Sequence, residues 1–74
     1  MKIKDNVNLD VLFDLGFQKE KFIGYVLNGE KEGDWIKQIA TVNEETRNIW
    51  ISKGHEEEVK KLLKDYLEKN DEDN

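Results

Sequence analysis

The chain has 74 residues, of which 39% are charged, with a formal net charge of −5 and no cysteine. A chain of this length makes one domain near the lower limit for a single hydrophobic core, and it has neither a disulfide nor a thiolate metal site to stabilise it. The first twenty residues contain no apolar run longer than Val11–Phe13, so we expect a cytoplasmic protein without a secretion signal or a membrane span.

The negative charge is concentrated at the C-terminal end. Residues 1–64 hold 11 Lys/Arg against 12 Asp/Glu, whereas the last ten residues contribute −4 to the net charge. We therefore expect one α+β domain over residues 1–69, followed by an acidic, disordered tail over residues 70–74. The nearly neutral body has no basic stripe, so direct nucleic-acid binding is not expected.

In chain order, the first predicted element is a short helix within the segment VNLDVLFDLGF, residues 7–17. Asn8 can cap the free amides of its first turn, and Gly16 suits the left-handed position that ends a helix. Two turns of helix are not stable alone, so this helix depends on packing.

Three strands are predicted next, in the segments KFIGYVL (21–27), WIKQIATV (35–42) and RNIWIS (47–52), which are rich in β-branched and aromatic residues. The connections, residues 28–33 and 43–46, have hairpin length, so the strands should form an antiparallel meander. This arrangement places Leu27 opposite Asp34 and Val42 opposite Arg47.

The last predicted element is an amphipathic helix from His55 onward, with an apolar stripe of Val59, Leu62, Leu63, Tyr66 and Leu67. The single histidine stands before Glu56–Glu58, and carboxylates are favourable in the first turn of a helix because of its dipole. A zinc site of the HExxH kind would need a second histidine at position 59. We predict no catalytic, cofactor-binding or metal-binding residue, and we expect no enzyme activity.

Alternation along the strands predicts a sheet with two apolar faces. One face is aliphatic and collects Ile23, Tyr25, Leu27, Ile36, Ala40, Val42, Ile49 and Ile51. The other face is aromatic and collects Phe22, Val26, Trp35, Ile39 and Trp50. The C-terminal helix can cover one face, and the aromatic face is then covered either by the N-terminal helix or by another molecule. These five residues are the predicted partner-binding site.

The segments MKIKDNVNLDVLFDLGF and VNEETRNIWI resemble small, uncharacterised proteins of phages and prophages in low-GC Gram-positive bacteria. The resemblance implies a phage-encoded accessory protein that works in the host cytoplasm, and it assigns no functional residues. Our main hypothesis is a non-enzymatic protein that binds a host or defence-system protein and modulates or inhibits it. Two alternatives stay open: a structural homodimer joined through the tryptophan face, and an acidic DNA mimic that acts through the tail and Glu56, Glu57, Glu58 and Asp65.

Overall fold

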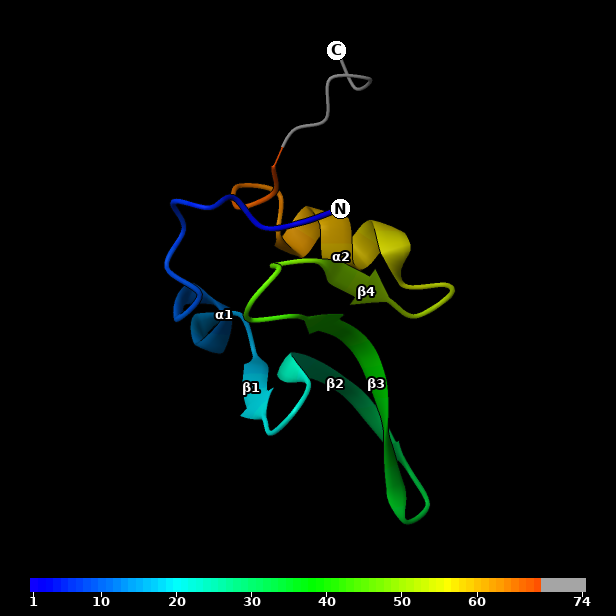
Figure 1. Cartoon of the computed structure of the whole chain (residues 1–74). Coiled ribbons are helices and arrows are strands. Elements are labelled where there is room, and N and C mark those ends of the chain that lie inside the picture. The colour runs from blue at the N-terminus through cyan, green and yellow to red at the C-terminus, as the bar shows by residue number, and fades with distance from the viewer. Residues whose placement is uncertain (69–74) are drawn as a thin grey trace.

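The computed structural model describes residues 1–68, which form an α+β fold with a four-stranded antiparallel sheet in the order β1-β2-β3-β4 (Figure 1). The predicted α+β class and antiparallel sheet are confirmed. The predicted acidic tail over residues 70–74 lies outside the described residues. The elements are α1 (Val11–Asp14), β1 (Phe17–Glu20), β2 (Gly24–Glu32), β3 (Trp35–Val42), β4 (Ile49–Ile51) and α2 (Glu56–Leu62).

The prediction of three strands is wrong, because residues Phe17–Glu20 form a further strand, β1. This strand pairs with the start of β2, from Phe17 opposite Leu27 to Glu20 opposite Gly24. Only Phe17 among its four residues is buried, and the other three are polar and exposed. Such a strand has no apolar alternation of its own, so its conformation depends on the neighbouring strand that supplies its hydrogen bonds.

Both helices are shorter than predicted. Asn8 accepts a hydrogen bond from the N–H of Asp10 at 2.9 Å, but this bond closes a turn before α1 rather than capping it. Gly16 has a φ of 101°, the left-handed conformation expected after a helix. At the other end of the chain, α2 stops at Leu62, and Leu67 pairs with Ile3 in an isolated antiparallel bridge. Backbone pairing with the N-terminal segment therefore replaces the last predicted helical turn.

Residues 1–4 lie beside β4 and the segment 66–68, so both ends of the described chain meet (Figure 1). The N–H of Ile49 donates to the carbonyl of Met1 at 3.0 Å, and the N–H of Lys4 donates to the carbonyl of Tyr66 at 2.9 Å. The side chain of Ile3 is completely buried. The N-terminal segment is consequently part of the folded core rather than a free end.

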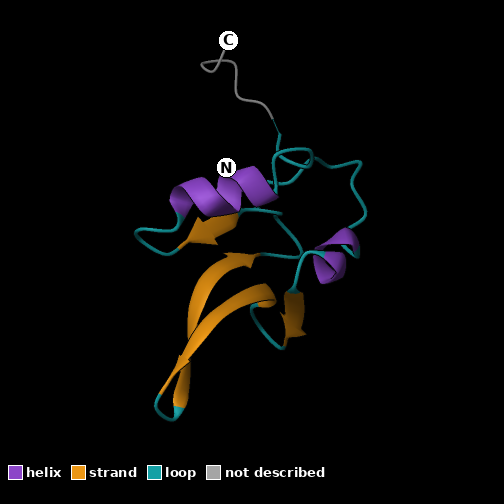
Figure 2. Ribbon diagram, turned by 180° about the vertical axis from the view of Figure 1, so that it is seen from behind, coloured by secondary structure: helices purple, strands orange, loops and turns teal. Residues whose placement is uncertain are grey.

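One hydrophobic core joins both helices to the same face of the sheet. Its buried members are Ile3, Leu12, Phe17, Tyr25, Ala40, Val42, Val59 and Leu63. Leu12 belongs to α1 and Val59 belongs to α2, and Leu63 is the residue directly after the end of α2. In Figure 2 the turn that joins β2 to β3 extends away from both helices. Since α1 and α2 both pack on this face, neither helix covers the opposite face of the sheet.

The β2–β3 hairpin is longer than predicted, and its turn is tighter. Glu32 pairs with Trp35, so Gly33 and Asp34 alone form the turn, and the predicted loop over residues 28–33 is wrong. Gly33 has a φ of 62°, which glycine adopts at little cost, and a glycine at the first position is typical of a two-residue hairpin turn. The hairpin therefore continues beyond the rest of the sheet as a projecting arm.

Irregular pairing inside this hairpin changes which side chains share a face. Leu27 pairs with Ala40, but the next residue of β2, Asn28, pairs with Gln38, so Ile39 is an extra residue on β3. A bulge of this kind re-aims the side chains that follow it. Ile39 accordingly packs against the core instead of joining the aromatic face.

The β3–β4 hairpin also differs from its predicted register. Val42 pairs with Ile49 rather than with Arg47, and Thr41 pairs with Trp50. The carbonyl of Asn48 accepts a hydrogen bond from the N–H of Asn43 at 2.9 Å, which closes a loop over residues 44–47. The shift is two residues, so it preserves the predicted faces of β4: Ile49 and Ile51 pack against the core, while Trp50 points away from it.

Candidate protein-binding surface

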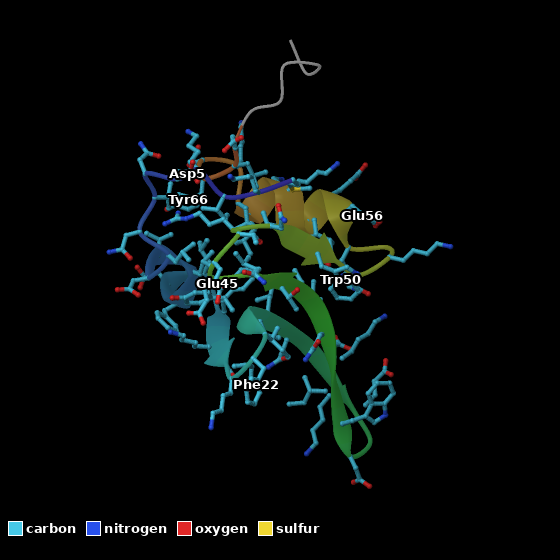
Figure 3. The ribbon with its side chains drawn as sticks, in the orientation of Figure 1. Asp5, Phe22, Glu45, Trp50, Glu56 and Tyr66 are labelled. Carbon is cyan, nitrogen blue, oxygen red and sulfur yellow. The ribbon has the colours of Figure 1, made fainter. Side chains whose placement is uncertain are left out.

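Five large apolar side chains are exposed on the β1–β2 loop and the strands. Their exposed fractions are 98% for Phe22, 41% for Ile23, 66% for Trp35, 48% for Ile36 and 53% for Trp50. We call these five residues the aromatic surface. In Figure 3, Phe22 extends from the loop between β1 and β2, and Trp50 lies between β4 and the projecting part of β3. Neither helix covers these side chains.

Three open hollows lie between the side chains of the aromatic surface and connect them. The first, of about 350 Å³, is lined by Phe22 and Ile23, and the second, of about 380 Å³, by Ile23 and Trp50. The third, of about 580 Å³, is lined by Trp50, Trp35 and Ile36. Each hollow shares a large apolar side chain with the next, so the surface is continuous.

The backbone holds Phe22 in an unfavourable conformation. Its φ of 72° lies in the left-handed region, which costs a residue with a Cβ roughly 1–2 kcal/mol. Its side chain is almost fully exposed, so burial of the ring within this chain does not offset that cost. Backbone strain of this kind clusters at functional sites, including binding sites.

The structure separates the five predicted partner-binding residues. Phe22, Trp35 and Trp50 are exposed and belong to the aromatic surface, whereas Val26 is completely buried and Ile39 packs against the core. Val26 points to the same side as Thr41 and Trp50, but it lies beneath the surface. The side chains of Val26 and Ile39 are therefore not part of the aromatic surface.

Sequence reasoning placed Ile23 and Ile36 on the aliphatic core face, and both are exposed instead. Ile23 precedes the first residue of β2, so strand alternation does not apply to it. Ile36 lies between the bulge at Ile39 and the turn, where the extra residue exchanges the two faces of β3. The bulge depends on how β2 and β3 pair, and no residue type in the sequence identifies it.

The charged side chains around the aromatic surface are mostly acidic. Glu44 and Glu45 line the hollow at Phe22, Glu32 and Lys37 line the hollow at Trp35, and the hollow between them contains no charged side chain. Lys19 forms a 3.1 Å ion pair with Glu44. The hydrogen bond from Lys19 to Glu44, together with the charge of that carboxylate, raises the pKa of Lys19.

The segment His55–Glu58 forms the start of α2, as predicted. His55 is the N-cap residue, and its ring nitrogen Nδ1 contacts Oε1 of Glu58. Both side chains line a hollow of about 380 Å³ between α2 and the hairpin arm, together with Glu30 and Glu32. In residues 1–68 no group of three or more His, Cys, Asp or Glu side chains is arranged to hold a metal ion.

Glu56 gives the start of α2 a pH dependence. Its carboxylate accepts a hydrogen bond from the N–H of Gly54 at 2.7 Å, and this bond lowers the pKa of Glu56. A lowered folded-state pKa stabilises the fold above the usual glutamate pKa, and this stabilisation is lost as the pH falls through the lowered value. We therefore expect wild type to lose more stability than Glu56→Gln between about pH 6 and pH 3, measured by urea unfolding.

The matched control for this experiment is Glu57→Gln, which changes an exposed carboxylate in the same helical turn. Its stability should follow the pH dependence of wild type. If Glu56→Gln also follows wild type, the hydrogen bond to Gly54 does not stabilise the folded state.

No helix in the described part of the chain is long and apolar enough to cross a membrane. Comparison with protein-family models, with curated proteins and with solved structures finds no match to this chain. The resemblance to phage and prophage proteins therefore stays a prediction, and the candidate site rests on the geometry of the aromatic surface.

Proposed function

We propose that this chain is a non-enzymatic binding protein that docks on another protein through the aromatic surface and modulates or inhibits it. The observation that carries the proposal is the continuous exposure of Phe22 on the β1–β2 loop and of Trp35 and Trp50 on the sheet, which neither helix covers. The resemblance to phage and prophage proteins supports a host or defence-system protein in the host cytoplasm as the target.

The size of the surface suits a protein partner. A buried aromatic side chain covers about 150–250 Å², so the exposed fractions of the three aromatic residues correspond to roughly 300–550 Å². The largest apolar patch of a typical monomer is of similar size and is often functional, and a standard interface buries about 800 Å² on each partner. The three aromatic side chains thus supply about half of such an interface, and aromatic residues dominate binding energy.

Affinity capture from a host lysate tests the proposal when wild type is compared with Trp50→Glu. The new charge should weaken binding to the captured protein, once it is purified, at least about 30-fold, because a buried aromatic anchor contributes about 2 kcal/mol or more. Leu62→Glu is the matched control, since it places the same charge on an exposed apolar position of α2, away from the aromatic surface. This control should bind like wild type, and both variants are first shown to fold by circular dichroism.

Salt concentration separates the alternatives. Capture through the aromatic surface should persist at 0.5 M salt, where the Debye length is about 4 Å. Capture that disappears at this salt concentration and does not depend on Trp50 would favour the acidic surface of a DNA mimic. A concentration-dependent doubling of mass in sedimentation experiments, lost in Trp50→Glu, would favour the homodimer.

A further inference from the structure

One edge of β3 has no strand beside it near the turn of the hairpin. β4 pairs with β3 only from Ala40 to Val42, and a hydrogen bond of 2.7 Å from the N–H of Ser52 to the carbonyl of Ile39 is the last one between them. Within residues 1–68, no segment pairs with the same edge from Trp35 to Gln38. Backbone N–H and C=O groups on an open strand edge can bind a further strand.

The largest hollow of the aromatic surface lies beside this open edge. It measures about 580 Å³, and its lining includes Trp35, Ile36 and Gln38 from β3 together with Trp50 and Ser52 from β4 and its end. In Figure 3, Trp50 lies at the corner where β4 stops and β3 continues toward the turn. A strand placed here would extend the line of β4 and lie beside Ile36 and Trp50.

Backbone chemistry favours an extended segment over a helix as the occupant. A helix satisfies its own backbone groups internally, so it offers none to the edge of β3, whereas an added strand hydrogen-bonds along it. Alternate side chains of such a strand point to one face of the sheet, which here presents Ile36 and Trp50. Hydrogen bonds along the edge and apolar contacts in the hollow would then act together.

Charge favours a different protein over a second copy of this chain. The turn end of the edge has two acidic residues, Glu32 and Asp34, and the whole chain has a net charge of −5, so two copies repel each other. Lys37 lies in the middle of the edge, and an edge lysine discourages pairing between identical strands. The complementary strand is apolar in its middle and basic at the end that lies beside the turn.

We propose that the edge of β3 from Trp35 to Gln38 receives an extended, apolar strand of a partner protein, with a lysine or arginine at the end that meets Glu32 and Asp34. This inference rests on the proposed function and specifies how the partner docks. The strand adds to the sheet beyond β4, and its apolar side chains contact Ile36 and Trp50.

A random library of nine-residue linear peptides, displayed on yeast, tests the inference. Peptides that bind wild type are kept, and peptides that also bind the folded Trp50→Glu variant are removed. The expected consensus has apolar residues at alternate positions and a basic residue at one end. The best peptide is then synthesised, and its binding is followed by tryptophan fluorescence. Trp35 and Trp50 are the only tryptophans of the chain, and both line the hollow.

Backbone methylation of that peptide identifies strand addition. Two versions are made, with N-methyl groups on the odd-numbered or on the even-numbered amides. An added strand turns alternate amides toward β3, so one version should bind at least about 30-fold more weakly and the other within about threefold of the parent. Glu32→Lys should weaken binding of the basic-ended peptide several-fold at low salt, and it should improve binding of an acidic-ended version.

Three outcomes overturn the inference. In the first, no peptide binds wild type in preference to Trp50→Glu. In the second, the consensus has apolar residues at helical spacing, and in the third, both methylated versions bind like the parent. The second and third outcomes, with binding still lost in Trp50→Glu, leave the aromatic surface as a binding site and reject only strand addition. If no peptide is enriched, strand addition is rejected, and the capture experiment decides separately about the proposed function.

Discussion

Replacing Gly24 with alanine is expected to cost at least about 3 kcal/mol of folding free energy, a large part of the roughly 4–11 kcal/mol that stabilises a domain of this size. Gly24 begins β2 and has a φ of 113°, which residues with a Cβ rarely adopt. A Cβ at this position would lie 2.3 Å from the carbonyl oxygen of Val42 and 3.0 Å from the backbone nitrogen of Glu44. Both neighbours are backbone atoms, so the clash cannot be relieved by a change of rotamer.

Gly33→Ala is the matched control for this experiment. Gly33 also has a positive φ, but no atom lies within 4 Å of an added Cβ, so the variant should lose only the roughly 1–2 kcal/mol of backbone strain. Thermal unfolding followed by circular dichroism should give a melting temperature at least about 12 °C lower for Gly24→Ala and a much smaller decrease for Gly33→Ala. Equal decreases would show that the backbone around Val42 moves to accommodate the methyl group.

Replacing Arg47 with methionine is expected to destabilise the fold by about 2–4 kcal/mol, because a hydrogen bond to a charged group contributes roughly 1.5–3 kcal/mol. One terminal nitrogen of the guanidinium donates to the carbonyl of Lys4 at 2.7 Å and to that of Val7 at 2.6 Å. The backbone carbonyl of Arg47 also accepts the N–H of Ile3 at 3.0 Å. Arg47 therefore joins the β3–β4 loop to the N-terminal segment, and methionine keeps the length of the side chain without its donors.

Urea unfolding measures this loss, and Lys53→Met is the control, because Lys53 is an exposed cation outside the ion pairs of the described chain. Its stability should stay within about 0.5 kcal/mol of wild type. Amide hydrogen exchange adds a local measurement: in Arg47→Met the amides of Ile3 and Lys4 should exchange faster than those of β2. If Arg47→Met is as stable as Lys53→Met, the pairing of the N-terminal segment does not need the guanidinium.

Sequence reasoning predicted the parts of the fold that depend on local patterns. Ile49, Trp50 and Ile51 alternate, and the structure places Trp50 on the opposite side from the two isoleucines, even though the predicted register was two residues off. The glutamates after His55 predicted the first turn of α2, and Gly16 predicted the end of α1. These features follow from the geometry of a few neighbouring residues, so they survive errors in the longer-range pairing.

Long-range pairing decided what the sequence did not predict. The polar strand β1 exists because β2 lies beside it, and the bulge at Ile39 moves that side chain to the core and leaves Ile36 exposed. The helix predicted to continue to Leu67 ends earlier, because residues 66–68 pair with the N-terminal segment. In each case the deciding hydrogen bonds join residues far apart in the chain, and no local pattern specifies them.

The sequence by itself determined that the sheet has more apolar surface than one helix can cover, and that two tryptophans lie on strands predicted to be neighbours. It left open whether the N-terminal helix covers these tryptophans, since a short amphipathic segment can pack on either face. The tertiary structure decided the question: Leu12 of α1 enters the same core as Val59 and Leu63. Both helices are used on one face, because burying their apolar side chains together makes a single core, and Trp35 and Trp50 therefore stay exposed.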